Sequence, residues 1–211
     1  MSARPAGHHA RREARRLTVW SIAAIGMVLA VLVAVVLASG WSFATVLAIE
    51  LAAVGAIFAI ERLAGPKVDR WVMGARGEER VGALLDELRA EGWVAIHGVD
   101  TGRGNIDTFL AGPGGVFTIE VKATEGKLSA RRIHPSVLRQ AHAQRKWVEQ
   151  LIQRPVSPLV VYSHAYLLGR GVNHHGGVCI LTARMLVGHL RRRKPVLAPD
   201  EVRRITRLVA A

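Results

Sequence analysis

Three charged residues, Asp107, Glu120 and Lys122, lie close together in an otherwise largely apolar stretch of the chain, NIDTFLAGPGGVFTIEVK over residues 105–122. The GPGG segment predicts a tight turn, and the apolar runs on either side of it predict the two strands of a hairpin. Antiparallel pairing across this turn brings Asp107 opposite the end that carries Glu120. Lys122 shares a face with Glu120 because alternate residues of a strand point the same way.

Two acids and a lysine on a buried hairpin suit metal-assisted hydrolysis of a phosphate ester. Carboxylates a few ångströms apart repel each other unless a cation lies between them, and Mg²⁺ prefers such hard oxygen ligands. A neighbouring lysine can orient the attacking water or help to deprotonate it, and can stabilise the negative charge that develops at the phosphate. The pattern therefore predicts a site for Mg²⁺, or for Mn²⁺, with Asp107 and Glu120 as ligands.

A helix is predicted from Glu78 to Glu91, directly before the hairpin, because Val81, Leu85 and Leu88 recur at intervals of three and four residues. Glu78 falls on the apolar face of this helix, three residues before Val81. An acid on an apolar face requires a partner. Glu78 is therefore a candidate third acid of the same site.

Each candidate also has an ordinary structural explanation. An E-x-K pair at a strand end is commonly a solvated edge pair. Asp107 alone could cap the backbone amides of a turn, and Glu78 alone could interact with the dipole at a helix N-terminus. Only the joint placement of these residues on apolar elements favours the metal site.

The rest of the C-terminal part predicts an α/β domain. A long helix begins at Pro135 and reaches Ile152, and a loop rich in Gly and His, which contains His174 and His175, separates the last two strands. The predicted strands cover residues 93–99, 105–111, 115–122, 159–162 and 178–181, and two further helices cover 182–193 and 199–209. The order is helix, three strands, helix, two strands and two helices.

The motifs GARGEERV, NID, GPGGVFTIEVK and a later helix containing QA resemble those of the nuclease-related domain (NERD) family, within the PD-(D/E)XK restriction-endonuclease-like superfamily. The resemblance covers roughly residues 74–162. It implies an α/β fold with a restriction-endonuclease-like mixed sheet flanked by helices. It also implies metal-dependent hydrolysis of phosphodiester bonds. The implied partner is nucleic acid, with DNA as the favoured substrate.

The resemblance further implies which residues form the site. Asp107, Glu120 and Glu78 hold the metal, and the family pattern places a glutamine on the later helix. Gln140 matches the position of that glutamine, although the family's Asn-Pro before the helix is His134-Pro135 here, with shifted spacing ahead of Gln140 and Gln144. The catalytic set implied in this way is Glu78, Asp107, Glu120, Lys122 and Gln140.

Two long apolar runs precede this domain. Residues 20–38 contain no charged side chain and residues 41–60 contain only Glu50, and each run is close to the roughly 20 residues that span a bilayer as a helix. Ser39-Gly40 between them predicts a transmembrane α-helical hairpin with both outer ends on one side. The arginines before the first run and Arg62, Lys67 and Arg70 after the second place both termini in the cytoplasm of a bacterial-type cell, in a multi-pass protein of the inner membrane.

The predicted organisation has four parts: a basic cytoplasmic arm over residues 1–18, two transmembrane helices within 19–62, a linker over 63–73, and a NERD nuclease-like domain over 74–211. Gly65-Pro66, within the linker, is expected to stop the second helix. The arm is expected to be disordered until it meets anionic lipid. A signal peptide cleaved near Ala38 is the alternative, and the second apolar run would still anchor its product.

A net charge of +13 favours binding to anionic lipid through the arm and to nucleic acid through the domain. Cys179 is the one cysteine, so it fits a reduced compartment and a buried structural role. Two other functions stay open: a tethered module that binds nucleic acid or protein without turnover, and a membrane hairpin in which Glu50 does the work. The sequence leaves the oligomeric state undetermined.

Overall fold

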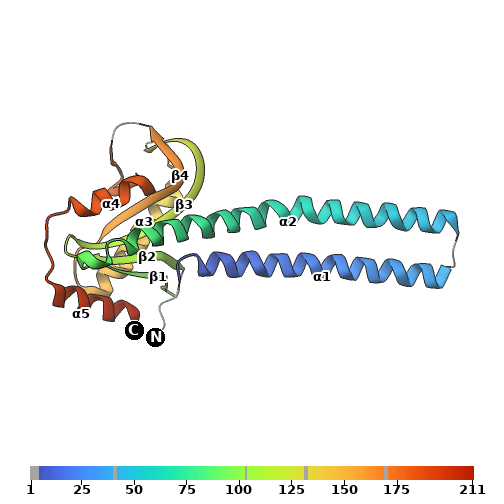
Figure 1. Cartoon of the computed structure of the whole chain (residues 1–211), viewed down its shortest axis with the longest axis horizontal. Coiled ribbons are helices and arrows are strands. Elements are labelled where there is room, and N and C mark those ends of the chain that lie inside the picture. Colours follow the sequence, from blue (N-terminus) through green and yellow to red (C-terminus); the bar gives the residue numbers. More distant parts are fainter. Residues whose placement is uncertain (1–4, 40–41, 103, 131–132, 169–170) are drawn as a thin grey trace. The chain divides into compact units, whose positions relative to one another are not determined.

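The computed structural model describes residues 5–39, 42–102, 104–130, 133–168 and 171–211 (Figure 1). The chain divides into two compact units. The first comprises the residues up to His8 together with Gly74–Ala211, and the second comprises His9–Met73. The first unit therefore contains both the predicted α/β domain and a short N-terminal segment.

The second unit is helical. Helix α1 covers His8–Ser39, and helix α2 covers Phe43–Asp86 and continues into the first unit. Both are long and apolar enough to cross a membrane by length and composition, over Ala10–Val35 and within Phe43–Asp86. These are the two apolar helices that the sequence predicts, and Gly40 of the predicted tip lies outside the described residues.

Two expectations about the ends of these helices are wrong. Helix α1 begins at His8, so most of the basic arm is helical where disorder was expected. Helix α2 passes through Pro66 to Asp86, so the predicted linker is helical too. A proline removes its own N–H from the helical ladder and crowds the carbonyl four residues earlier, so a helix through Pro66 runs against the local preference. The Pro66 carbonyl accepts a side-chain hydrogen bond from Arg70 Nε at 3.1 Å.

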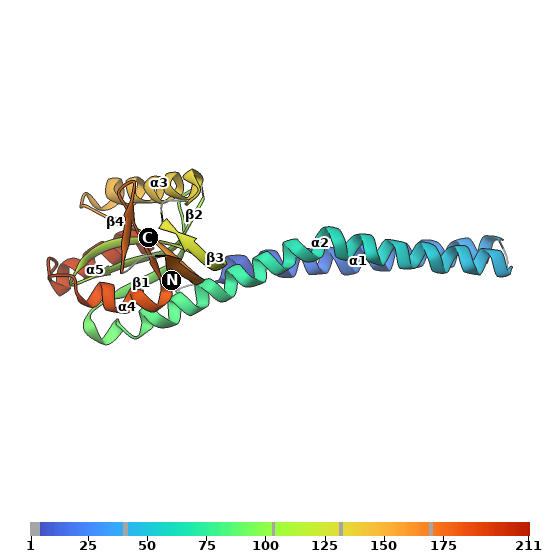
Figure 2. The same cartoon turned by 90° about the horizontal axis from the view of Figure 1, so that it is seen from above.

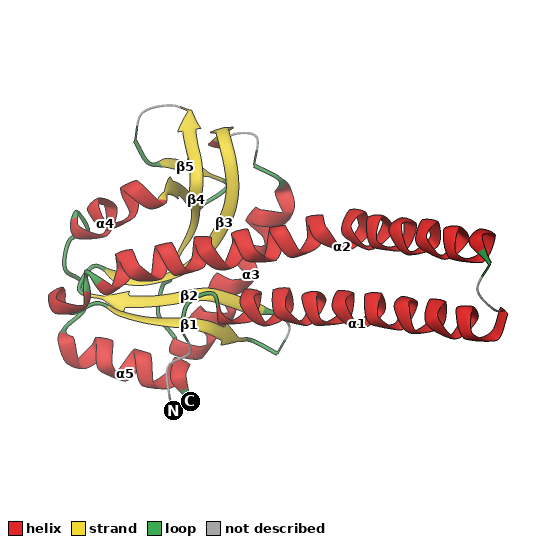
Figure 3. Ribbon diagram, turned by 45° about the vertical axis from the view of Figure 1, so that its right-hand side comes forward, coloured by secondary structure: helices red, strands yellow, loops and turns green. Residues whose placement is uncertain are grey.

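The first unit is built on one mixed sheet of six strands, in the order β1-β2-β3-β4-β6-β5 (Figure 3). The strands are β1 (Val94–Asp100), β2 (Asn105–Gly112), β3 (Gly115–Ser129), β4 (Ser157–Leu168), β5 (Asn173–His175) and β6 (Val178–Thr182). The pairs β1–β2, β2–β3 and β5–β6 are antiparallel, whereas β3–β4 and β4–β6 are parallel. The predicted α/β class with a mixed sheet is confirmed.

Helices cover both faces of this sheet. The last turns of α2 and helix α4 (Ala183–Arg191) pack on one face through residues such as Leu85 and Leu186. Helix α3 (Pro135–Ile152) and helix α5 (Pro199–Ala210) pack on the other face, through Val148 and Ile205. Figure 2 shows α3 and α4 on opposite sides of the strands. The apolar face of each amphipathic helix is therefore buried against the sheet.

Two differences from the predicted elements affect the polar end of the sheet. Strands β3 and β4 run past Lys122 and Tyr162, and a shift in register between Lys122 and Glu125 separates their inner parts from these extensions. The predicted loop at His174 and His175 is instead the edge strand β5. Three polar residues on an edge strand give no apolar alternation, so the sequence carried no signal for it.

Candidate active site

The hairpin β2–β3 brings Asp107 next to Glu120. Its pairing runs from Gly112 opposite Gly115 to Thr108 opposite Ile119, so Asp107 and Glu120 are the next residues in the same register. The Val121 backbone N–H donates to Asp107 Oδ2 at 2.7 Å. This bond ties one carboxyl oxygen of Asp107 to the neighbouring strand and fixes the side chain at the point where the pairing ends.

Glu120 is the buried centre of the site. Glu120 is 3% exposed, and each of its carboxylate oxygens accepts a short hydrogen bond. Lys122 Nζ donates to Oε1 at 2.5 Å, and Gln144 Nε2 donates to Oε2 at 2.6 Å. A buried carboxylate is tolerated when it is paired and hydrogen-bonded in this way. We call Glu78, Asp107, Glu120, Lys122 and Gln144 the acid cluster.

Two of the three glutamines of helix α3, Gln140 and Gln144, contact the cluster in different ways. Gln144 is buried, and its amide nitrogen also donates to the Asn105 carbonyl at 3.1 Å. Gln140 lies one turn earlier and is exposed, and its Oε1 accepts only a long contact of 3.5 Å from Lys122 Nζ. The structure therefore makes Gln144 the glutamine that holds Glu120, whereas the resemblance had placed Gln140 in the site. The four-residue spacing puts both on one helix face, so the sequence did not distinguish them.

Glu78 reaches the cluster from helix α2. Burial raises the pKa of Glu78 from 4.5 to about 7, and the nearby charges of Glu120 and Glu79 act in the same direction. Helix α2 lies close to the sheet at Gly77, as the distance of 2.6 Å from a Cβ placed there to Ser163 Oγ indicates. The carboxyl groups that the sequence placed on separate elements therefore interact electrostatically.

The N-terminal segment is a part of the site that sequence reasoning missed. The Gly7 backbone N–H donates a hydrogen bond to Glu78 and opposes the rise of its pKa. Gly7 has a φ of 76°, and a Cβ there would lie 2.8 Å from the Ala75 carbonyl oxygen. A Cβ on Gly82 would likewise lie 2.7 Å from the Ala6 Cβ. Small residues allow this close approach, and such a composition alone is too weak a signal to predict it.

Asp107 is a second carboxyl group of the cluster whose charged form is disfavoured. Burial raises the pKa of Asp107 well above its usual range, and the charges of Glu120 and Glu78 raise it further. The Val121 N–H and the Lys122 ammonium oppose this shift. Three carboxyl groups this close favour either a bound proton or additional positive charge.

The donor chemistry of the cluster fits a hard divalent cation, because carboxylate oxygens are the ligands that Mg²⁺ and Mn²⁺ prefer. Within the described residues, however, no group of three or more His, Cys, Asp or Glu side chains is arranged to hold an ion. Both oxygens of Glu120 are engaged, and the cation that it holds in this structure is the Lys122 ammonium, 2.5 Å away. The metal site thus stays a prediction, with Asp107, Glu120 and Glu78 as the residues that would hold the ion.

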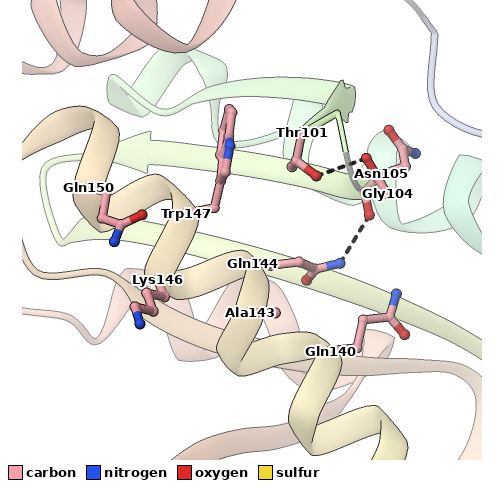
Figure 4. A pocket seen from close by; sticks show the side chains of 9 residues that line it. All are labelled: Thr101, Gly104, Asn105, Gln140, Ala143, Gln144, Lys146, Trp147 and Gln150. Atoms are coloured by element: carbon pink, nitrogen blue, oxygen red, sulfur yellow. Dashed lines mark hydrogen bonds between the residues drawn. The ribbon is translucent and has the colours of Figure 1, made fainter.

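Two pockets flank the contact between Lys122 and Gln140. One, of about 350 Å³, is lined by Lys122 together with Lys127, His134 and Tyr162. The other, of about 580 Å³, lies on the Gln140 side between α3 and the start of β2 (Figure 4). None of the described residues that line either pocket is acidic. A chain of phosphates could therefore approach the cluster from both sides without meeting further negative charge.

Cys179 has the buried role that the sequence predicts. It is a free, buried cysteine on β6, and burial raises its pKa to about 11. A thiol with such a pKa is protonated at neutral pH and is a poor nucleophile. Cys179 is therefore not a candidate nucleophile.

A mixed sheet flanked by helices, with carboxylates and a lysine gathered where the pairing of β2 with β3 ends, defines an α/β protein with a polar site on its sheet. Comparison with protein families matches residues 73–163 to the nuclease-related domain, NERD, and this part of the chain is a NERD domain. The match contains every member of the acid cluster and indicates a nuclease-like function. Comparison with the curated proteins and with the solved structures finds no significant match.

Proposed function

We propose that this protein is a membrane-anchored, metal-dependent nuclease that hydrolyses phosphodiester bonds of nucleic acid on the cytoplasmic side of the inner membrane, with DNA as the favoured substrate. One observation carries the proposal: Asp107, Glu120 and Lys122 converge in the middle of β3, where its pairing with β2 ends, within the NERD domain. The set is of the PD-(D/E)XK restriction-endonuclease-like kind, with Asp107 as the first acid and Glu120 and Lys122 as the E-x-K pair.

Mg²⁺ or Mn²⁺ held by Asp107, Glu120 and Glu78 would lower the pKa of a bound water and neutralise charge on the phosphate. The protein's own groups then have separate roles. Gln144 holds Glu120 in place through Oε2, and the Val121 N–H leaves the second oxygen of Asp107 available. The Lys122 ammonium can donate to the phosphate or orient the water.

In the hydrolysis itself, the water oxygen forms a bond to phosphorus and loses a proton, and the ester P–O bond breaks. The leaving oxygen takes up a proton. Lys122 is placed to balance the negative charge that develops on the phosphoryl oxygens, since it lies beside Glu120 and lines a pocket with Lys127. The pocket cations and the net charge of +13 favour binding of a polyanionic chain.

The anchoring part of the proposal rests on α1 and α2. Two apolar helices with arginines before the first and Arg62, Lys67 and Arg70 after the second favour both termini in the cytoplasm. The arginines in the first turns of α1 would lie near anionic lipid. The nuclease would then act on nucleic acid that approaches the membrane.

The test uses the full chain, purified from the membrane fraction in detergent. With Mg²⁺ or Mn²⁺ it should cut DNA, and EDTA should stop the reaction. Lys122→Ala should slow cleavage by at least about 10²-fold, because loss of one group that stabilises the transition state costs this much. Lys194→Ala is the control, since this exposed lysine follows α4 and lies outside the acid cluster. If wild type and Lys122→Ala are equally inert on DNA and on RNA, the enzyme proposal is wrong.

A second function, a tethered binding module without turnover, is favoured by one observation. Both oxygens of Glu120 are already engaged by Lys122 and Gln144, which is a stable arrangement that needs no metal. Salt-sensitive DNA binding that survives Asp107→Ala, with no metal-dependent cleavage by wild type, would select this function.

A further inference from the structure

The pocket on the Gln140 side of the acid cluster differs in chemistry from the cluster itself. Its volume is about 580 Å³, which lies in the range of roughly 300–1,000 Å³ for small-molecule sites. Four of its nine lining residues are amides, one is Trp147, and Lys146 is the single charged residue among those described. The amides are Asn105, Gln140, Gln144 and Gln150.

These groups match the chemistry of a nucleobase. An amide side chain offers both a donor and an acceptor, as the edge of a base does. In the described part of the chain, the side-chain amides of Asn105 and Gln150 make no hydrogen bond within the protein. Figure 4 shows the Trp147 indole standing out from α3 toward Thr101, beside Gln150. An aromatic face of this kind stacks bases with little regard to sequence.

The pocket is directly joined to the acid cluster. Gln144 lines the pocket and also donates to Glu120 Oε2 at 2.6 Å. Gln140 lines it too and contacts Lys122 Nζ at 3.5 Å. A base held here would therefore belong to a nucleotide beside the one whose phosphate reaches Lys122.

We propose that this amide-lined pocket binds an unpaired base of a nucleic-acid strand, with Trp147 as the stacking surface. The proposal rests on the proposed function, since it names the part of the substrate next to the reacting phosphate. A base inside a duplex has both faces covered by its neighbours, so only a single-stranded or extruded base can enter. The pocket thus gives the protein a preference for single strands and unpaired ends.

Trp147 also has a structural role, because it packs against the apolar cluster that contains Val148 and Ile205. The experiment must separate stacking from packing. Trp147→Leu keeps an apolar side chain of substantial size and removes the ring, and its thermal midpoint shows whether the fold is retained. Trp93→Phe is the matched control, since Trp93 is 4% exposed and packs on the other face of the sheet.

Binding is measured with the full chain in detergent and EDTA, by anisotropy of a labelled oligo(dA) of about 15 nucleotides, within the range that such sites cover. A second oligomer has the same phosphates but abasic sugars, and free dAMP is a third ligand. Wild type should bind oligo(dA) about 5- to 150-fold more tightly than the abasic oligomer, the range that stacking of one base gives. Trp147→Leu should lose this preference while binding the abasic oligomer as wild type does. Trp93→Phe should keep it.

Every other outcome overturns the proposal. If Trp147→Leu keeps the preference for bases, the ring is not the stacking surface. If a folded Trp147→Leu weakens both oligomers equally, its effect is structural. If dAMP binds as tightly as oligo(dA), the pocket takes a free nucleotide and not a strand. Because the measurement excludes metal, a protein that binds bases in this way but never cuts would refute the proposed hydrolysis alone.

Discussion

The acid cluster and the amide-lined pocket share helix α3, yet their polar groups are held in opposite ways. In the cluster, the carboxylate of Glu120 is buried and both of its oxygens are bonded to protein groups. In the pocket, Lys146 and Gln150 are exposed and lie along an open cavity. Buried charge must be satisfied inside the protein, whereas polar groups on a cavity wall can be satisfied by water until a ligand replaces it. Removing a hydrogen-bond or charge partner from the cluster should therefore lower the stability of the fold. Removing an exposed polar side chain from the pocket wall should not.

The largest expected difference compares two lysines, one from each region. Lys122→Met leaves the buried carboxylate of Glu120 without its cation, which should lower the free energy of unfolding by about 3 kcal/mol. Lys146→Met removes an exposed charge and should change it by less than about 0.5 kcal/mol. Thermal or urea denaturation of the full chain at pH 7 in EDTA measures both. Equal effects would show that Glu120 does not depend on Lys122.

A smaller difference is expected between Gln140 and Gln144 of α3. Gln144→Leu removes the donors to Glu120 Oε2 and to the Asn105 carbonyl, and a lost hydrogen bond to a buried charge costs about 2 kcal/mol. Gln140→Leu removes one long contact from an exposed residue and should cost less than about 0.5 kcal/mol. The same denaturation experiment applies. A Gln140 variant as unstable as the Gln144 variant would contradict the assignment of Gln144 as the residue that holds Glu120.

The smallest expected effect is a dependence of stability on pH. The pKa of Glu78 is about 7 in the folded protein and 4.5 when unperturbed, so between these values the folded state binds more protons than the unfolded state. The free energy of unfolding should therefore fall as the pH rises through this window. Asp107, whose pKa is also raised, acts in the same direction.

Glu78→Gln should flatten this dependence by about 1 kcal/mol between pH 5 and pH 8, after allowance for screening of a partly exposed group. Glu87→Gln, which changes an exposed acid just beyond α2, should keep the wild-type slope. Denaturation in EDTA at a series of pH values gives both slopes. A slope that survives Glu78→Gln unchanged would mean that this carboxyl group is not strained in the fold.

Much of the acid cluster could be predicted because its members are close in sequence. Asp107 and Glu120 lie on two strands joined by a tight turn, and the alternation of side chains along a strand places Lys122 beside Glu120. Glu78 was found from its place on an apolar helix face. These are short-range regularities, and each element obeys them whatever the rest of the chain does.

Other features depend on contacts between distant parts of the chain. Which of the two glutamines meets Glu120 depends on how α3 is rotated against the sheet, and one helix face carries both. The hydrogen bond from Gly7 to Glu78 joins residues far apart in the sequence. The edge strand at His174 exists because β6 offers it a partner, and helix α2 continues through Pro66 against the local preference of a proline.

The sequence by itself therefore determined the hairpin, the apolar helices, the nuclease-related family and four of the five members of the acid cluster. Local periodicity and turn chemistry are sufficient for these features. Only the tertiary structure decided that Gln144 completes the cluster, that Gly7 lies against Glu78, and that an amide-lined pocket with Trp147 adjoins the site. Each of these requires surfaces from separate elements to meet, and no pattern within a single element encodes how they pack.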